Sequence, residues 1–227
     1  MTSDSMSDIK IANLIRSRRR SIALIVTPEA TLTVRAPLHT PLLFIESLIQ
    51  KKSAWIHQRI KEVQVRPRSA PWRFVEGEEF LFLGKPYRLK YSDGDRIELS
   101  ADLLFPRDFL SRCEEEMTYW YRQQALRLIQ ERVDHNARSM ALRPGAVRLN
   151  DTTSRWASCG GDGVLRFSWR LIMAPLPVLD YVVIHELSHL VVRNHSARFW
   201  STVREMCPDY RNLRSWLRHN QERIIPI

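Results

Sequence analysis

The sequence predicts an α+β fold, in which a strand-rich N-terminal region with one long helix precedes a helical C-terminal region with a small antiparallel sheet. Short segments of the N-terminal half alternate apolar and polar side chains, which is typical of half-buried strands. The C-terminal half instead holds longer segments whose apolar residues recur at helical spacing. We expect the two regions to cover residues 9–105 and 106–227.

A hairpin and a helix are expected first along the chain. Residues 20–26 and 31–36 alternate apolar and polar side chains around a turn at residues 27–30, which indicates a hairpin. Thr40-Pro41 fits the cap and the first turn of a helix. Apolar residues then recur at helical spacing to about residue 64, so we expect one continuous helix.

A second strand-rich segment follows a short linker. Residues 66–72 contain prolines and are expected to form the linker. Residues 80–83 and 87–91 predict a second hairpin around Gly84-Lys85-Pro86, and residues 97–99 predict one more strand.

The C-terminal region is expected to begin with a long helix at residues 107–139. Residues 147–149 are a strand candidate, and the glycines of residues 160–163 predict a turn. Residues 164–171 alternate apolar and polar side chains, so we expect a half-buried strand just before the next helix.

The motif His185-Glu186-Leu187-Ser188-His189 says most about the chemistry. Residues four apart on a helix lie on one face, with Cβ atoms about 5–6 Å apart. Both imidazoles can therefore reach one Zn²⁺ ion, and Glu186 is placed to act on a metal-bound water. The preceding residues 178–184 are mostly apolar and Pro177 suits a first helical turn, so we expect a buried helix.

His195 is the expected third metal ligand. A continuous helix would rotate His195 by about 120° from His189, because each residue turns the helix by about 100°. The helix must therefore end between them. We expect the end at Arg193-Asn194, since a cationic side chain suits a helix C-terminus and Asn tolerates the left-handed conformation. Ser196 would then cap the next helix.

The wider sequence resembles one zincin family more than another. The spacing equals the metzincin pattern HExxHxxGxxH, but Val192 stands at the glycine position and no Met-turn is evident. The chain instead resembles the YgjP-like metallopeptidases, which are related to the SprT-like zincins. The resemblance rests on Arg155–Cys159, Leu165–Pro175, Asp180–Leu190 and Asn194–Trp200, with shorter N-terminal matches at residues 18–21, 34–37, 55–56 and 80–85.

This resemblance implies a zinc metallopeptidase, with a zincin-like domain at residues 106–227. It implies that His185, His189 and His195 bind zinc and that Glu186 is the catalytic residue. Ala157 departs from the family, which usually has glycine after the tryptophan; the departure leaves the ligands untouched.

An open zinc site predicts hydrolysis. Three protein ligands leave one coordination position free, as in catalytic zinc sites. We expect Glu186 to take a proton from the zinc-bound water that attacks a peptide carbonyl, and to pass it to the leaving group. The oxyanion could be stabilised by any of three candidates, Arg155, Tyr181 and Ser158. The strand at residues 164–171 would align an extended peptide by strand addition.

Two other functions stay open at this point. The same site could hydrolyse a nucleotide or another phosphoester. Alternatively, the protein could be a zinc-stabilised module that binds nucleic acid, in which Glu186 has no role. A closed structural site would need a fourth ligand, which Cys159 or Cys207 could supply.

Composition limits the partners and the compartment. The 227 residues carry a formal net charge of +10, which suits nucleic acid or another anionic partner besides a protein or peptide substrate. No apolar run approaches the roughly 20 residues of a membrane helix, and residues 1–8 lack a signal-peptide core, so we expect a cytoplasmic protein without a membrane partner. Three widely spaced cysteines fit a reducing compartment. The oligomeric state stays open.

Overall fold

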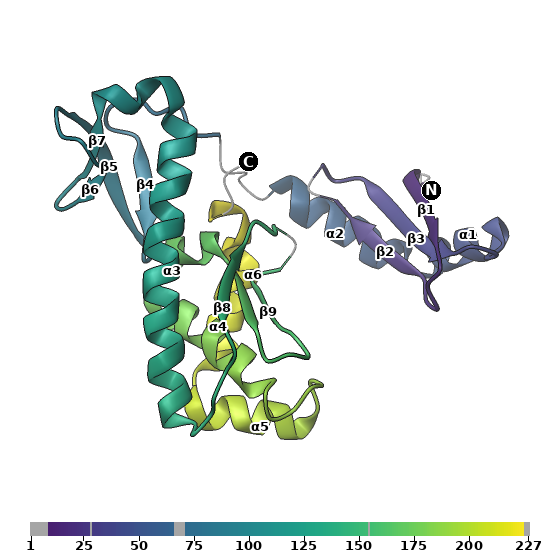
Figure 1. Cartoon of the computed structure of the whole chain (residues 1–227). Helices are drawn as coiled ribbons and strands as arrows, with labels where there is room; N and C mark the ends of the chain where they lie inside the picture. Colours follow the sequence, from purple (N-terminus) through teal and green to yellow (C-terminus); the bar gives the residue numbers. More distant parts are fainter. Residues whose placement is uncertain (1–8, 28, 66–70, 154, 225–227) are drawn as a thin grey trace. The chain divides into compact units, whose positions relative to one another are not determined.

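The computed structural model describes residues 9–27, 29–65, 71–153 and 155–224 (Figure 1). The chain forms two compact units, Met1–Arg68 and Ser69–Ile227, rather than dividing at residues 105 and 106. Most of the expected linker at residues 66–72, Pro28 of the first turn and the N-terminal residues 1–8 lie outside the described residues.

The first unit is a three-stranded sheet with two helices packed on one face. The strands are β1 (Ile11–Ser17), β2 (Ala23–Val26) and β3 (Leu32–Pro37), in the order β1-β3-β2. The helices are α1 (Leu42–Lys51) and α2 (Ser53–Val65). One small core joins them, made of the buried residues Leu32, Val34, Ala36, Ile45, Ile49 and Ile56.

The two predictions for this unit have different outcomes, and one strand was not predicted. The first hairpin is confirmed, because β2 pairs antiparallel with β3. The single continuous helix is wrong: the helix breaks at Lys52, while Ile49 and Ile56 on either side face the same core, so the apolar spacing continues across the break. Strand β1 was not predicted; it pairs parallel with β3 at the sheet edge, and its residues after Ile11 are exposed.

The second unit begins with a four-stranded sheet beside the N-terminal end of α3 (Cys113–Ser139) (Figure 1). Its order is β4-β5-β7-β6, with strands β4 (Glu79–Phe82), β5 (Lys85–Ser92), β6 (Glu98–Leu99) and β7 (Leu103–Pro106). The second hairpin and the strand near residues 97–99 are confirmed. A 3₁₀ helix, η1 (Arg107–Arg112), leads into α3, so the α-helix begins later than expected.

This sheet belongs to the same core as the rest of the second unit. Phe80, Leu89 and Phe105 of the sheet are buried in one cluster with Tyr121 of α3 and Trp169 beyond it. The expected boundary at residues 105 and 106 would cut through this cluster. The compact units therefore divide before the sheet and not after it.

A second, three-stranded sheet precedes the helix that carries the motif. Its strands are β8 (Val147–Asn150), β9 (Ala157–Cys159) and β10 (Leu165–Ser168), in the order β8-β10-β9. The sheet was expected to be antiparallel; β9 does pair antiparallel with β10, but β8 pairs parallel with it. Strand β10 ends before residue 171, because a 3₁₀ helix, η2 (Trp169–Met173), follows it directly.

The C-terminal helices complete the second unit. They are α4 (Leu176–Ser188), α5 (Ala197–Met206) and α6 (Tyr210–Asn220), followed by the 3₁₀ helix η3 (Gln221–Arg223). Helix α4 is almost entirely buried, as its apolar sequence predicts. Arg132 of α3 donates two hydrogen bonds to the Asp180 carboxylate of α4, at 2.6 and 2.9 Å, which fixes the two helices against each other.

The β4–β5 turn holds the start of α4 in place. The N–H groups of Leu83 and Gly84 donate to the carbonyl oxygens of Ile172 and Met173, at 2.8 and 3.1 Å. Gly84 has a φ of +78°, and a Cβ at this position would lie 2.7 Å from Cγ of Pro175, the cap of α4. Only glycine fits both the backbone conformation and this close approach.

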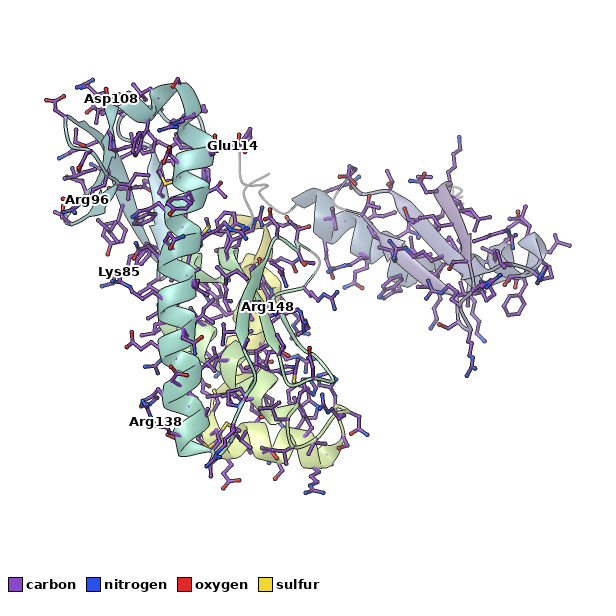
Figure 2. All side chains as sticks on the ribbon, in the orientation of Figure 1. Lys85, Arg96, Asp108, Glu114, Arg138 and Arg148 are labelled. Carbon is purple, nitrogen blue, oxygen red and sulfur yellow. The ribbon has the colours of Figure 1, made fainter. Side chains whose placement is uncertain are left out.

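Helix α3 is the longest described helix, with 27 residues. Charged side chains run along it, from Glu114 near its start to Arg138 near its end, and Figure 2 shows both pointing outward from the unit. Within the described part of the chain, no helix combines the length and the apolar character needed to cross a membrane.

Candidate metal centre

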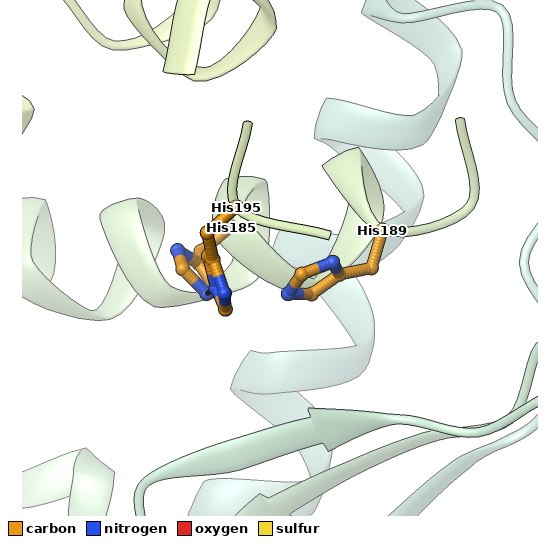
Figure 3. Close-up of side chains that lie close together, drawn as sticks. All are labelled: His185, His189 and His195. Atoms are coloured by element: carbon orange, nitrogen blue, oxygen red, sulfur yellow. Dashed lines mark hydrogen bonds between the residues drawn. The ribbon is translucent and has the colours of Figure 1, made fainter. Parts of the chain in front are cut away.

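Three histidine side chains meet at the C-terminal end of α4. One ring nitrogen from each of His185, His189 and His195 lies within 4.8 Å of the others, and Figure 3 shows the three side chains gathered at the end of the helix. The Nε2 atoms of His185 and His195 are 3.1 Å apart. The structure thus brings together the three histidines that the sequence predicts as ligands.

The turn that leads from α4 to His195 begins earlier in the sequence than expected. Helix α4 ends at Ser188, with His189 as its C-terminal cap, and not near Arg193 and Asn194. The Ser188 carbonyl oxygen accepts hydrogen bonds from the N–H groups of both Val191 and Val192, which tightens the chain into a turn. The required break between His189 and His195 is therefore present, but it begins directly at His189. Ser196 stands at the cap position of α5, although its side chain makes no capping hydrogen bond.

The geometry fits a tetrahedral metal ion. Two ligands at about 2.0–2.1 Å from a tetrahedral Zn²⁺ lie roughly 3.3 Å apart, close to the separation of the His185 and His195 nitrogens. His189 Nδ1 lies 3.1 Å from the Val192 carbonyl oxygen, which can only accept a hydrogen bond. The proton of neutral His189 is therefore on Nδ1, and its Nε2 lone pair is free for a metal.

Burial keeps two of these histidines in the form that binds a metal. Loss of solvent lowers the pKa of His185 to about 3, with smaller contributions from the charges of His189, His195 and Arg214. Burial also lowers the pKa of His189. A neutral imidazole is the form that binds a metal, so neither ring has to lose a proton at neutral pH.

Glu186 is buried beside the histidines, with 5% of its surface exposed. Burial raises its pKa to about 7, while a hydrogen bond from the Cys159 backbone N–H and the charge of Arg155 lower it. A carboxyl group with a pKa near neutrality can both accept and return a proton under the same conditions, which suits general acid–base catalysis.

Two neighbouring cavities share the wall formed by Ala157, His185 and Glu186. The metal cavity, about 280 Å³, is further lined by His189, His195, Arg193 and the β9 residues Ser158 and Cys159. The arginine cavity, about 310 Å³, is further lined by Arg155 and Trp156 before β9, by Tyr181 and Val182 of α4, and by Arg214, Leu217, Arg218 and Gln221 on or just after α6.

The other predicted site residues are divided between these cavities. Ser158 lines the metal cavity, whereas Arg155 and Tyr181 line the arginine cavity. Cys159 lines the metal cavity, but its Sγ is directed to the Gly160 carbonyl oxygen at 3.6 Å. Among the described residues, the group of side chains placed to hold a metal contains the three histidines and neither Cys159 nor Cys207.

Aromatic rings behind the histidines were not predicted as part of the site. The Phe199 ring stacks on His189 with 4.5 Å between centroids, and the Trp200 ring stacks on His195 at 5.7 Å. Arg214 of α6 lies over the Trp200 ring at 4.9 Å. The sequence places Phe199 and Trp200 only on the apolar side of a helix, and no local pattern indicates which rings they contact.

Strand β9, and not β10, forms the edge of the sheet at the metal cavity. Strand β10 is the central strand and pairs with a neighbour on both sides, so the expected strand addition to residues 164–171 is wrong. The Gly160 N–H donates to the Val164 carbonyl oxygen, and the Ser168 N–H donates to the Trp156 carbonyl oxygen. Backbone groups alternate in direction along a strand, so those of Ala157 and Cys159 are directed to the free edge of β9. The hydrogen bond from Cys159 N–H to Glu186 has this direction.

A family comparison agrees with this geometry. The family model of the YgjP-like metallopeptidase domain matches residues 20–220, which is most of the chain. No curated protein and no solved structure matches the chain. The chain therefore belongs to the YgjP-like metallopeptidase domain family.

Proposed function

We propose that the protein is a zinc-dependent peptidase, with His185, His189 and His195 as the ligands and Glu186 as the catalytic base. The observation that carries the proposal is the placement of a buried carboxyl group beside three converging imidazoles. Zinc bound there would act as a Lewis acid that polarises the scissile carbonyl and lowers the pKa of a water molecule toward about 7.

Glu186 handles the proton in this proposal. Its carboxylate takes a proton as the attacking water adds to the carbonyl, and then gives the proton to the leaving amine. The carboxylate lies at the shared wall of the two cavities.

The free edge of β9 supports an extended substrate. The N–H and C=O groups of Ala157 are directed away from β10, toward the edge that borders both cavities. A peptide that pairs with this edge would run past Glu186 and the histidines, and would gain main-chain hydrogen bonds that do not depend on its sequence.

The test combines metal analysis with proteolysis. We expect the purified chain to bind one zinc ion and to cleave an unfolded protein pool, and Glu186→Gln to keep the zinc while cleavage falls by about 10²–10⁴-fold. Glu205→Gln, on the exposed side of α5, is the matched control and should cleave normally. Full zinc occupancy without cleavage of any peptide would overturn the proposal.

A phosphoester hydrolase is the second candidate function. The observation that favours it is the group of three arginines beside Glu186, since guanidinium groups also bind phosphate. Incubation of the zinc-loaded chain with nucleotides, followed by product analysis, separates the two. Phosphate release that disappears in both Glu186→Gln and His189→Ala would favour this function.

A further inference from the structure

The arginine cavity lies beside the metal cavity and is strongly unbalanced in charge. Arg155, Arg214 and Arg218 line it, whereas Glu186 is the one acidic residue among the described residues of its lining. Among the described residues, none of the three arginines forms an ion pair. Within the described part of the chain, the positive charge of this cavity is therefore only partly neutralised, by Glu186.

A metal ion next to the cavity would increase the imbalance. The three guanidinium groups are charged at neutral pH, and a divalent ion on neutral histidines would add two positive charges. Glu186 offsets only one of them. A cavity with this excess attracts an anionic group and disfavours a cationic one.

Much of the remaining wall is apolar. Trp156, Tyr181 and Leu217 contribute to it, and Arg214 is held over the Trp200 ring by a cation–π contact. A group with an aliphatic portion and a terminal carboxylate matches both properties. The aliphatic portion would pack on the apolar walls, and the carboxylate would pair with the guanidinium groups.

We propose that the arginine cavity binds a carboxylate of the peptide substrate close to the scissile bond, and so makes the enzyme selective for acidic substrates. The proposal rests on the peptidase function above. Ala157, His185 and Glu186 line both cavities, so a peptide whose carbonyl lies at the metal cavity brings a neighbouring residue to the arginine cavity. The carboxylate comes either from an aspartate or glutamate side chain or from the C-terminus of the peptide.

Matched peptides test the proposal and identify the source of the carboxylate. In one pair, a cleaved peptide with an amidated end carries Glu or Gln at each position next to the scissile bond. In the other pair, a neutral peptide ends in a free carboxylate or in an amide close to the bond. We expect kcat/KM to be about 10-fold or more higher for the charged member of at least one pair, as for a charge-assisted hydrogen bond.

Arg218 is the residue to change, because it lines the arginine cavity and not the metal cavity. Arg218→Gln should reduce the preference for the charged peptide by about fivefold or more, and Arg218→Lys should restore part of it because the positive charge returns. Arg211→Gln removes the same charge from α6 outside both cavities, and is the matched control. It should leave the preference unchanged.

A binding measurement gives a second readout that needs no turnover. On the Glu186→Gln background the peptides stay intact, and their Kd can be measured by calorimetry. We expect the charged peptide to bind about 10-fold more tightly, with a difference that shrinks at high salt and in Glu186→Gln/Arg218→Gln.

The outcomes separate this proposal from the proposed function. Equal kcat/KM for charged and neutral peptides would overturn the carboxylate site while leaving the peptidase intact. No cleavage of any peptide would overturn both. A phosphoserine peptide that is cleaved faster than the glutamate peptide would overturn the carboxylate assignment in favour of a phosphate site. An equal effect of Arg211→Gln and Arg218→Gln would show that overall charge, and not this cavity, sets the preference.

Discussion

The metal cavity and the arginine cavity share one wall but are built in different ways. The ligands of the metal cavity come from the end of α4 and the turn after it, from His185 to His195. The arginines come from the segment before β9 and from α6, which flank α4 in the sequence. The metal cavity thus depends mainly on local chain geometry, and the arginine cavity on the packing of three elements.

The two cavities also differ in the charge they present. The metal cavity offers three imidazoles and a carboxyl group, whose lone pairs suit a cation. The arginine cavity offers guanidinium groups, which suit an anion. Catalysis would then take place in the metal cavity and substrate selection in the arginine cavity, on opposite sides of Glu186. Substitutions in one cavity can therefore be made without changing the other.

The largest expected effect comes from removing one metal ligand. His189→Ala leaves two imidazoles, and we expect zinc affinity to fall by more than about 100-fold, beyond the loss typical of outer-sphere changes. The arginine cavity does not include His189, so its residues should be undisturbed. Competition with a chromophoric chelator measures the affinity. His135→Ala, at an exposed position of α3, is the control, and an equal loss there would contradict the assignment.

The second-largest expected effect concerns Glu186 at the shared wall, and how the free energy of unfolding depends on pH. Burial raises the Glu186 pKa from 4.5 to about 7, so between these values the unfolded chain releases a proton that the folded chain keeps. The metal-free protein should therefore lose stability as pH rises from about 4.5 to 7, by up to about 3 kcal/mol. Glu186→Gln removes this loss.

Denaturant unfolding of the metal-free parent and of Glu186→Gln at a series of pH values checks this prediction. The stability difference should grow in favour of Glu186→Gln between about pH 4.5 and 7, and then stay constant. A difference that does not change with pH would mean that the Glu186 pKa is not raised by burial.

The sequence predicts the metal cavity well because its information is local. The spacing of His185 and His189 fixes their common face, and helix geometry alone requires a break before His195. The predicted position of that break was wrong. The turn depends on hydrogen bonds to the Ser188 carbonyl oxygen, and no residue pattern reveals these bonds.

The parts that were not predicted depend on contacts between distant segments. Arg214 and Arg218 are arginines of an amphipathic helix in the sequence, and only the packing of α6 against α4 places them at Glu186. Strand β9 is too short to show an alternation of apolar and polar residues. The substrate-binding edge was therefore predicted at the longer alternating segment that contains β10. The compact units divide before the second sheet and not at residues 105 and 106, because Phe80 and Phe105 join a core that forms mostly from later residues.

The third effect concerns the scaffold under both cavities. Gly84→Ala forces a Cβ to within 2.7 Å of Pro175 Cγ at a φ of +78°, so we expect a loss of about 1–3 kcal/mol in the free energy of unfolding. Gly77→Ala has a similar φ of +87° but open space around the added Cβ, and should cost less. Thermal unfolding compares the two. Equal losses would mean that the contact with the start of α4 contributes nothing.

The smallest expected effect lies outside both cavities, at Asp151. Hydrogen bonds from Arg170 and Trp169 lower the pKa of this carboxyl group, which is opposite in sign to the effect of burial on Glu186. Its contribution to stability is therefore present above about pH 4 and is lost as pH falls through the lowered pKa. Because the Asp151 side chain is 66% exposed, we expect Asp151→Asn to cost less than about 1 kcal/mol at neutral pH.

The same pH series separates Asp151 from Glu186. The cost of Asp151→Asn should disappear in acid, whereas the gain from Glu186→Gln should appear as pH rises toward 7. Asp108→Asn, an exposed carboxylate on η1 (Figure 2), is the matched control for the loss of one negative charge. If Asp108→Asn shows the same acid dependence, the effect at Asp151 reflects net charge and not its bonds to Arg170 and Trp169. If only Asp151→Asn shows the acid dependence, its bonds to Arg170 and Trp169 stabilise the fold. Glu186 is then the contrasting carboxyl group, because its burial destabilises the fold at neutral pH. Such a cost is expected of a group kept at the shared wall for chemistry rather than for stability.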